Sequence, residues 1–416
     1  MTKKTVLLIS HVYPFPGATG QQQRVRSKLR ALHESFHITF LTTASSNSVA
    51  ETKQRLLEYC DEAIVLTSRY GQNRFEKSVR SLASLVYQLY TGLKRSNYRI
   101  GKVEFSLDRV QAIPGLERFD VVVYEYWHAV DTVCIFRNRG IPCVLDMHDI
   151  LSKSYQRQLA HTHWLPNYWK SSALKRYEQH EYNAWKTFDA LIAITDSEYK
   201  HVQALFPRKT LFYTPMGVDL KLWPYMWTPS APARIAYYGG LGNPYNQREA
   251  LRCYHHIMPH IWQIHPRTEF WIIGSNPSES LRELVRKDSR IHVPGFVEEI
   301  HSLLSTMTTV LCPFEGRFGF RSRLIEALAL GVPIVATPDA VYGMGLETGG
   351  GVFLDDRNES LAQFCLSLIE NNEFAHQQSL LARQQVEKNF SFEATYGKLA
   401  QDLYDFVSQN TSMAIL

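Results

Sequence analysis

One carboxylate, Glu326, interrupts an apolar run towards the C-terminus of the chain. Residues 317–337 read RFGFRSRLIEALALGVPIVAT, and helical spacing puts Leu324, Leu328 and Gly331 on one face. A charge in such a helix costs several kcal/mol unless it is paired or hydrogen-bonded. Two explanations are open. Either Arg323, three residues earlier, neutralises Glu326, or the carboxylate holds a polar ligand at the mouth of the helix.

Arginines stand immediately before this helix, which suits an anionic ligand. Arg321 and Arg323 follow the apolar stretch 309–314, and Gly319 permits a close approach of the backbone. Helix N-termini point amide groups at anions, and guanidinium groups bind phosphate oxygens in pairs. The pattern therefore predicts a site for a diphosphate. Gly331 and Pro333 predict the end of the helix, and a short buried strand follows at 334–336.

The rest of the chain alternates between strands and helices. Before residue 220, apolar strands are predicted at 5–10, 37–43, 119–127, 141–149, 188–195 and 210–219. Beyond residue 233 the pattern starts again, with strands at 234–240, 269–274, 291–295, 309–314, 333–337 and 351–355. Such alternation is typical of an α/β fold with doubly wound parallel sheets.

The strand pattern predicts two domains. Residues 1–220 form an N-terminal Rossmann-like domain, and residues 234–390 form a second one. The segment 221–233 holds three prolines and no apolar periodicity, so we expect an interdomain linker. We expect residues 391–416 to form a helix that packs back on the N-terminal domain. The two domains should face each other across a cleft, because ligands bind beyond the carboxyl ends of parallel strands.

Composition narrows the setting. Of 416 residues, 45% are hydrophobic and 20% charged, and the net charge of +5 indicates no dedicated nucleic-acid binder. The six cysteines have no C-x-x-C spacing, so we expect neither a zinc site nor a disulfide framework. The first apolar run is too short for a signal peptide, and no run of 18 apolar residues predicts a membrane span. A cytoplasmic location is expected.

Several motifs together resemble one known family. FGFRSRLIEALALGVPIVAT at 318–337, YTPMGVD at 213–219 and VPGFVEEI at 293–300 are similar to motifs of the retaining GT-B glycosyltransferases. The match is to the nucleotide-sugar-dependent group that carries an E-x7-E element, which is family 4-like and of the group 1 type. The resemblance covers most of residues 5–405. It implies a GT-B fold and transfer of a hexosyl-type group from a nucleoside diphosphate sugar to a hydroxyl acceptor, with retention.

The resemblance assigns the acceptor to the N-terminal domain, 1–220, and the donor to the C-terminal domain, 234–390. In the C-terminal domain it also assigns roles to single residues. Glu326 falls on the second glutamate of the element, which accepts hydrogen bonds from ribose hydroxyls. Gly319 and Phe320 match the loop beside the donor, and Arg321 and Arg323 match a variant of the element found in some members. Phe296 and Val297 fall where backbone groups contact the base.

The N-terminal half carries further expected site residues. Gly20, in PGATGQQQR, resembles the glycine loop near the donor phosphates, although an ordinary strand-to-helix turn explains it equally well. His148, in VLDMHD, resembles a strand-end histidine near the transferred sugar, and His128 is its weaker rival. Asp149 could orient His148, serve the acceptor or cap a helix.

Two departures from the family pattern concern charge. Phe318 replaces the first glutamate of the element, and Glu315 could substitute for it only with a different loop. The turn GGLGNPYNQREA at 239–250 lacks the usual arginine and lysine that hold the diphosphate, so Arg248, Arg321 and Arg323 must neutralise it.

The implied reaction needs fixed positive charge at the leaving diphosphate rather than a metal. No D-x-D motif is present, so we expect metal independence and no cofactor, and the leaving phosphate itself assists the acceptor. His148, Glu326, Arg321 and Arg323 are the residues expected to act in catalysis. Two other functions stay open: a nucleotide-sugar epimerase, and a non-catalytic GT-B partner subunit that has lost the site.

The segment 69–102 has an unusual charge. Eight basic residues face one acid, Glu76, for a net charge of +7. They flank apolar positions at helical spacing, namely Leu82, Leu85, Val86, Leu89, Tyr90 and Leu93. Two explanations are open: a core-packed helix with solvated ends, or a basic surface that docks on an anionic leaflet and meets a lipid-linked acceptor in glycan assembly. The second would place the protein at the inner face of a membrane.

Overall fold

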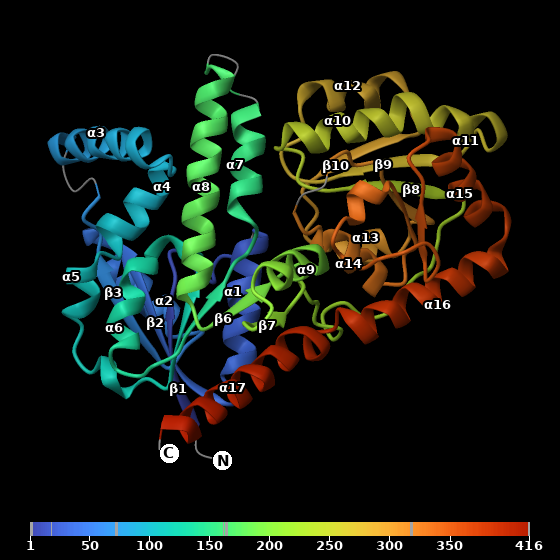
Figure 1. Ribbon diagram of the computed structural model, residues 1–416. Helices are drawn as coiled ribbons and strands as arrows, with labels where there is room; N and C mark the ends of the chain where they lie inside the picture. The colour runs from blue at the N-terminus through green and yellow to red at the C-terminus, as the bar shows by residue number, and fades with distance from the viewer. Residues whose placement is uncertain are drawn as a thin grey trace. The chain divides into compact units, whose positions relative to one another are not determined.

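The computed structural model describes residues 3–17, 19–70, 74–160, 162, 165–316 and 319–414. The chain divides into two compact units. Unit 1 comprises 1–214 and 396–416, and unit 2 comprises 215–395. Each unit is built around a parallel sheet with helices on it (Figure 1). The predicted α/β class with two Rossmann-like domains is confirmed.

Unit 1 contains a seven-stranded parallel sheet with the strand order β3-β2-β1-β4-β5-β6-β7. The strands are β1 (Lys4–Ile9), β2 (Phe36–Ala44), β3 (Glu62–Thr67), β4 (Val121–Glu125), β5 (Cys143–Asp146), β6 (Ala190–Ala193) and β7 (Thr210–Tyr213). The sequence analysis missed β3, whose residues Glu62 and Thr67 lack the full apolar character of the inner strands. It is an edge strand, so only part of its surface must be buried.

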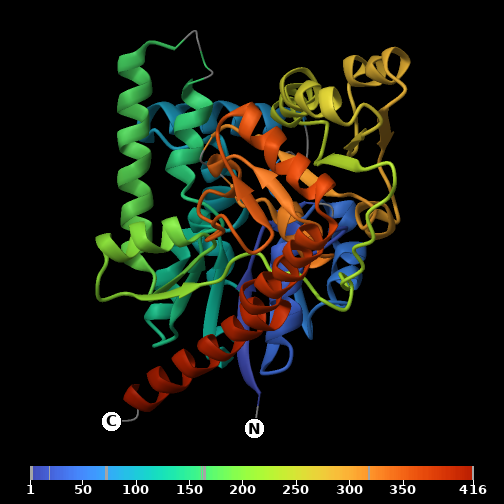
Figure 2. The ribbon, with the colours of Figure 1, turned by 90° about the vertical axis from the view of Figure 1, so that its right-hand side faces the viewer.

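Helices cover the sheet of unit 1 and extend beyond it. They are α1 (Gly20–Leu32), α2 (Val49–Leu56), α3 (Arg74–Thr91), α4 (Arg95–Asn97), α5 (Leu107–Gln111), α6 (Val133–Arg137), α7 (Leu151–Ala160), α8 (Asn167–Thr187), α9 (Asp196–Leu205) and α17 (Lys398–Ala414). A 3₁₀ segment η4 (Trp127–Thr132) lies beside α8, and a π-helical segment η2 (Tyr98–Glu104) lies beside η4. Helix α17, at the end of the chain, packs on α1 and β7 (Figures 1 and 2).

Unit 2 contains a six-stranded parallel sheet with the order β10-β9-β8-β11-β12-β13. Its strands are β8 (Arg234–Tyr238), β9 (Glu269–Ile273), β10 (Ile291–Gly295), β11 (Thr309–Cys312), β12 (Ile334–Ala336) and β13 (Val352–Leu354). Its helices are α10 (Pro244–Arg252), α11 (Met258–Ile264), α12 (Glu279–Lys287), α13 (Ile300–Leu304), α14 (Ser322–Ala329), α15 (Asn358–Glu370) and α16 (Asn372–Asn389). All six strands lie where the apolar pattern predicts them.

The chain passes between the units at positions other than the predicted ones. It crosses after Thr214 and again after Thr395, so the segment 221–233 is part of unit 2 rather than a linker. The physical reason is that this segment packs and hydrogen-bonds there. The backbone amide of Met226 donates to the Leu330 carbonyl, and Trp227 is buried with its indole donating to the Met307 carbonyl. Residues 391–395 also stay with unit 2.

Local sequence signals explain where the important helices begin and end. Thr19 and Thr195 each cap a helix through a capping box, with Gln22 and Glu198 as the reciprocal partners. Helix α14 ends before Gly331, which has φ +87° as predicted. A side chain at Gly331 would also strike Tyr225, because its Cβ would lie 2.4 Å from the ring. Among the described residues, we find no helix that is long and apolar enough to cross a membrane.

Candidate functional site

Each sheet has a point where the strand order reverses. In unit 1 the reversal lies between β1 and β4, and in unit 2 it lies between β8 and β11. Loops leave such a point in opposite directions at the carboxyl ends of the strands, which is where ligands of parallel sheets bind. The predicted site residues of the two halves gather near these two points.

At the reversal point of unit 1 lies a fully buried set of charges. The Arg24 guanidinium donates to both carboxylate oxygens of Asp146, with Nε 2.9 Å from Oδ2 and Nη2 3.0 Å from Oδ1. The Lys28 ammonium donates to Asp146 and to Glu125, at 2.6 Å from Glu125 Oε1. These four side chains are at most 3% exposed. Burial alone would raise the pKa of Asp146, but Arg24 and Lys28 hold it well below its usual range.

This set of charges holds His148 in place. His148 follows β5 in a left-handed backbone conformation with φ +59°. Its Nε2 forms a short hydrogen bond with Glu125, and its backbone amide donates to Asp146 Oδ1 at 3.3 Å. The ring of Tyr126 stacks on the imidazole with a centroid distance of 4.2 Å. The ring is held by Glu125 and Tyr126, and its backbone by Asp146, so the side chain is positioned before any ligand arrives.

The same carboxylates, together with His148, have the spacing of a possible metal site. Glu125, Asp146 and His148 each offer a ligand atom, and these atoms lie within 4.8 Å of one another. In the structure, however, protein cations already bind the carboxylates, since Lys28 contacts both of them and Arg24 grips Asp146. The donor set therefore fits an internal ion-pair network better than a metal centre. Metal independence stays a prediction.

His128 packs near the same tyrosine as His148, with its ring centroid 5.6 Å from that of Tyr126. It borders a cavity of about 420 Å³ that is also lined by Lys102, Asp131 and His180. Burial lowers the pKa of His128 well below its ordinary value. Its Nδ1 has no hydrogen-bond partner within the described part of the chain. His11, whose pKa burial lowers to about 4, stacks on the His128 ring at a centroid distance of 5.4 Å.

Asp149 does not orient His148. Its carboxyl interacts with the carboxyl of Glu198, and Arg157 donates to it at 3.5 Å. Burial, together with the Asp149 charge, raises the pKa of Glu198 to about 7. Two buried carboxyls in contact share a proton, because both cannot be charged at low cost. The expected contact in which Asp149 orients His148 is therefore not seen.

At the reversal point of unit 2, Arg323 lies against the end of β8. A Cβ added at Gly239 would be 2.5 Å from Arg323 Nη1, so only glycine leaves room for the guanidinium. The Arg323 contacts are weak: Nη1 and Nη2 each lie 3.5 Å from Asn246 Oδ1, and Nη2 lies 3.9 Å from Cys312 Sγ. Its Nε finds no acceptor among the described residues. This guanidinium therefore keeps donor capacity for a ligand.

Glu326 is satisfied by a tyrosine. The Tyr238 hydroxyl at the end of β8 donates to Glu326 Oε2 at 3.0 Å. Burial raises the pKa of Glu326, while Tyr238 and the Arg323 charge oppose the rise. No ion pair joins Glu326 and Arg323 in the described residues, so the first explanation for this carboxylate does not hold as a direct contact. The helix around it is buried as predicted, with Leu324 and Leu328 fully covered.

A second carboxyl of unit 2, on Glu249, was not expected. It lies in α10, is 2% exposed, and accepts a long 3.4 Å hydrogen bond from the Glu315 amide. Burial raises its pKa to about 7, against the lowering effect of Arg321 and Arg323. The Arg321 guanidinium stacks on the Phe314 ring and donates to the Ala340 carbonyl at 3.1 Å. Because Glu249 is partly protonated near neutral pH, the two arginines keep net positive charge.

Other expected residues lie in less telling positions. Arg248 is exposed and lies over the Tyr245 ring, on the face of α10 opposite the buried Asn246 and Glu249. The Glu315 side chain forms an ion pair with Arg252 at 3.0 Å and is 68% exposed. Its substitution for the first glutamate of the element stays a prediction. Phe318 lies outside the described residues.

The glycines and apolar residues of the predicted site differ in how well their conformation and exposure fit the expected roles. Gly319 has φ +71°, as a close backbone turn requires, and Phe320 packs towards Phe390 at 6.3 Å between centroids. Gly20 begins α1, and a side chain there would meet no atom within 4 Å. After β10, Phe296 is 78% exposed and Val297 is half-buried. Their roles towards the donor stay predictions.

Sequence reasoning missed most partners of the predicted residues. Glu125, Asp146, Lys28 and Arg24 surround His148, and Tyr238, Asn246 and Glu249 surround Arg323 and Glu326. One signal was present: Glu125 and Asp146 are acidic residues at the ends of apolar strands. Lys28 and Arg24 gave none, because their four-residue spacing on α1 is common on any solvated helix.

Comparisons with known proteins give the family. Residues 19–217 match the model of the glycosyl transferase 4-like domain, and 232–371 match that of the glycosyl transferases group 1. A comparison with the curated proteins found no match.

Solved structures share the fold of the whole chain. Sucrose-phosphate synthase (tll1590) from Thermosynechococcus elongatus has a TM-score of 0.66 at 16% identity, covering 98% of this chain and 100% of that one. HepE (Alr3699) from Anabaena, in complex with UDP, has a TM-score of 0.62 at 14% identity, covering 97% and 100%. Its complex with UDP-glucose gives 0.59 at 14%, covering 96% and 99%. With a glycosyltransferase domain matched in each half and this architecture throughout, the chain is a glycosyltransferase of the GT-B fold.

Proposed function

We propose that the chain transfers a sugar with retention from a nucleoside diphosphate sugar to a hydroxyl acceptor. The observation that carries this proposal is the charge state at the reversal point of unit 2. Arg321 and Arg323 lie there beside two carboxyls, Glu249 and Glu326, whose pKa values are both raised. Burial lowers the pKa of Arg321 only to about 10 and the pKa of Arg323 is raised, so both guanidinium groups stay charged at neutral pH. Arg323, with contacts of 3.5 Å or more, offers that charge to a diphosphate.

The donor is the first part of this proposal. HepE of Anabaena was solved with UDP and with UDP-glucose, which supports a uridine diphosphate sugar as the first donor to test. In our proposal the ribose hydroxyls bind Glu326, and the diphosphate binds Arg323 and the amides at the start of α14. The exposed Phe296 and its neighbour Val297 would meet the base.

The chemistry follows from the charges. As the bond between the sugar and the diphosphate breaks, negative charge grows on the leaving phosphate, and the arginines stabilise it without moving. The leaving phosphate oxygen takes the proton of the acceptor hydroxyl, whose oxygen forms the new bond on the same face of the sugar. No nucleophile of the protein is required. His148, fixed by Glu125 and Tyr126, would contact the transferred sugar in the reacting state.

The acceptor is the least constrained part of the proposal. We favour a lipid-linked glycan in cell-surface glycan or glycolipid assembly, reached from the cytoplasmic face of a membrane. The charge of the segment 69–102 supports this choice, since eight of its side chains are basic.

A binding experiment on Glu326 tests the donor site. Calorimetry should show that Glu326→Ala binds UDP more weakly by about 1.5–3 kcal/mol, because a charge-assisted hydrogen bond to ribose is lost. UDP analogues that lack the ribose hydroxyls should bind Glu326→Ala and the wild type with the same affinity. Unchanged UDP affinity would remove the ribose assignment. A wild-type protein that neither binds nor hydrolyses any nucleotide sugar would favour the non-catalytic partner subunit. Conversion of the nucleotide sugar to its epimer would favour the epimerase.

A companion variant separates His148 from the donor nucleotide. His148→Ala should lower turnover much more than it weakens UDP binding, because the ring would act only on the reacting sugar. Equal turnover in the variant and the wild type would overturn this role.

A further inference from the structure

Helix α3 exposes its apolar side rather than burying it. Six large apolar or aromatic side chains of this 18-residue helix are exposed: Phe75 by 78%, Val79 by 51%, Leu82 by 64%, Val86 by 57%, Leu89 by 50% and Tyr90 by 84%. Five of them recur at 75, 79, 82, 86 and 89, which is one continuous face of a helix. Soluble proteins scatter such residues singly, so a whole exposed face indicates a contact with something else.

The other face of α3, which packs on the protein, is more polar. It touches α4, η2 and α8. Ser84 is fully buried there with its hydroxyl bonded to the Ser81 carbonyl, and Tyr87 lies 5.3 Å from the Tyr98 ring. The core-packed explanation offered by the sequence is therefore wrong for Leu82, Val86 and Leu89. An amphipathic helix with its apolar side outward cannot owe that side to the core of this unit.

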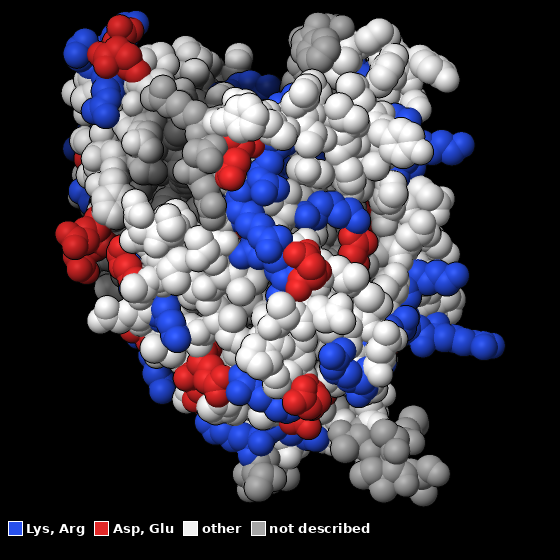
Figure 3. Space-filling model, turned by 90° about the vertical axis from the view of Figure 1, so that its left-hand side faces the viewer, with Lys and Arg blue, Asp and Glu red and all other residues white. Residues whose placement is uncertain are grey.

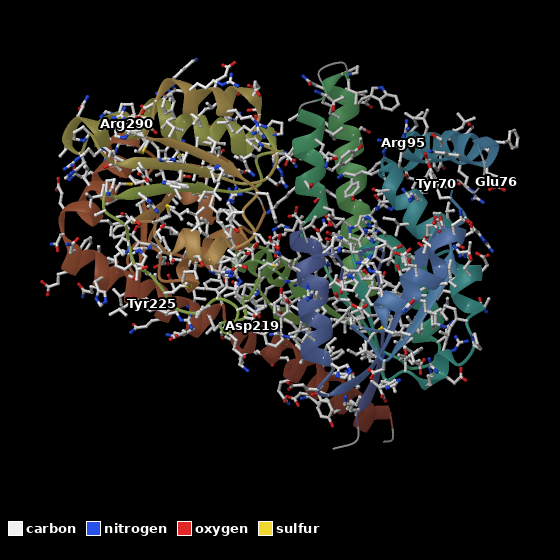
Figure 4. All side chains as sticks on the ribbon, turned by 180° about the vertical axis from the view of Figure 1, so that it is seen from behind. Tyr70, Glu76, Arg95, Asp219, Tyr225 and Arg290 are labelled. Carbon is white, nitrogen blue, oxygen red and sulfur yellow. The ribbon has the colours of Figure 1, made fainter. Side chains whose placement is uncertain are left out.

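Basic side chains accompany this face, but fewer than the sequence suggests. Four of the eight are engaged inside unit 1: Arg69 with Asp108, Lys102 with Asp131, Lys94 over the rings of Tyr155 and Tyr177, and Arg99 over the ring of Tyr70. Lys77, Arg95 and Arg99 are exposed. Glu76, at the outer end of α3, is half-buried, and Arg95 lies at the inner end (Figure 4).

The space-filling view from the side of α3 shows where charged residues lie on this face of the molecule (Figure 3). Lysine and arginine side chains form a band there, next to a broad area without charged residues (Figure 3). A helix of this length spans about 27 Å at 1.5 Å per residue. Phe75 lies near one end of the helix and Tyr90 near the other, and both are exposed on its apolar side, as in helices that lie in a membrane interface.

We propose that α3 is an in-plane membrane anchor. Its apolar face enters the boundary between headgroups and acyl chains of an anionic leaflet, while the positive charge of Lys77, Arg95 and Arg99 attracts the headgroups. The charge favours lipid over a protein partner, because an excess of basic side chains near an apolar face complements an anionic bilayer. This inference rests on unit 1 alone and does not require the proposed transfer reaction.

The anchor makes a prediction that a purely electrostatic surface does not. Salt at physiological strength largely screens the attraction between exposed charges that are more than about 8–10 Å apart, but it leaves burial of apolar side chains intact. Binding to vesicles should therefore weaken in high salt without vanishing. A surface that binds through lysine and arginine alone would release completely.

Vesicle co-sedimentation of the full chain tests the proposal. Wild type should sediment with phosphatidylcholine vesicles that contain phosphatidylglycerol, and less with phosphatidylcholine alone. The triple variant Val79→Ser, Leu82→Ser, Val86→Ser should bind at least about tenfold more weakly at low and high salt. The positions are exposed, so the variant should keep the wild-type circular dichroism and melting temperature.

Two matched variants sharpen this result. Leu205→Ser, Leu222→Ser, Leu380→Ser removes three exposed leucines elsewhere, at 41%, 63% and 41% exposure, and should bind like wild type. Lys77→Gln, Arg95→Gln, Arg99→Gln should remove the preference for anionic vesicles and keep the binding that survives high salt. No sedimentation of wild type, or equal binding of the apolar-face triple variant, would overturn the proposal. So would a dimer of wild type in ultracentrifugation that this variant dissolves, since the face would then belong to a second copy.

Discussion

The two reversal points of this glycosyltransferase carry similar residues in opposite states. In unit 1, Asp146 and Glu125 are paired with Arg24 and Lys28 at hydrogen-bonding distance, and the pKa of both carboxyls is lowered. In unit 2, Arg323 has only distant partners, and the pKa of both Glu249 and Glu326 is raised. Charge satisfied inside the protein builds a rigid support. Charge left without close partners builds a binding site.

The comparison extends to what glycine does in each region. In unit 2, Gly239 makes room for the Arg323 guanidinium, and Gly274 lies so close to the Gly239 carbonyl that a Cβ would be 1.8 Å from its oxygen. These glycines let a large cation approach the end of the sheet. At the unit 1 point, by contrast, Gly20 stands in open space. At the unit 1 point, close packing comes from paired charged side chains. At the unit 2 point, it depends on glycines, which have no side chain.

The largest expected effect tests whether the unit 1 network is structural. Lys28→Met leaves Glu125 and Asp146 buried with one cation fewer, so the free energy of unfolding should fall by about 3–5 kcal/mol in urea titrations followed by circular dichroism. Lys200→Met is the control, because its ion pair with Asp196 is exposed and should be worth less than about 1 kcal/mol. If Lys28→Met unfolds like wild type, the network is not the support that its geometry indicates.

A smaller effect, of a different kind, is expected in unit 2. Arg323→Met should change the free energy of unfolding by less than about 1 kcal/mol, because a similar apolar volume replaces a cation with weak partners. Its affinity for UDP should fall by about 1.5–3 kcal/mol in calorimetry. Arg282→Met, on the exposed side of α12, should alter neither quantity. A strong loss of stability with intact UDP binding would reverse the comparison.

The smallest effect concerns pH. The Glu198 carboxyl has its pKa raised from 4.5 to about 7, so it stays protonated in the folded chain while the unfolded chain ionises. Its contribution to stability is full below pH 4.5 and is lost as the pH rises through about 7. Glu198→Gln keeps the capping box with Thr195 and should remove this loss. Relative to wild type, the variant should gain on the order of 2 kcal/mol between pH 4.5 and pH 8.

Thermal melts across this pH range check the prediction. Glu178→Gln, at an exposed position on α8, is the control and should follow wild type. A Glu198→Gln protein that loses stability with pH as steeply as wild type would show that Asp149 and Glu198 do not share a proton.

Local pattern predicted the fold well. Six of the strands of unit 1 and all those of unit 2 follow from short apolar runs bounded by turn residues, because strands buried on both faces need little else. The end of α14 at Gly331 follows from glycine's access to the left-handed region. The missed strand β3 lies at an edge, where burial and its sequence signature are weaker.

The candidate site was predictable only in part. Arg321, Arg323 and Glu326 belong to one short motif, so the sequence brings them together without knowledge of the fold. Asp149 shows the limit, since its position beside His148 in the chain suggested a contact that Glu198 and Arg157 take instead. The two neighbours point to different partners because the left-handed backbone of His148 turns the chain sharply between them.

The sequence by itself determined the elements, the family motifs and the excess of positive charge between residues 69 and 102. Only the tertiary structure decided which charges are paired and which face is covered. Arg24 meets Asp146 across 122 positions, Lys28 meets Glu125 across 97, and Tyr238 meets Glu326 across 88. The apolar spacing of α3 is likewise the same whether the face lies inside or outside. Periodicity fixes which residues share a face, but the packing of distant elements decides what that face meets.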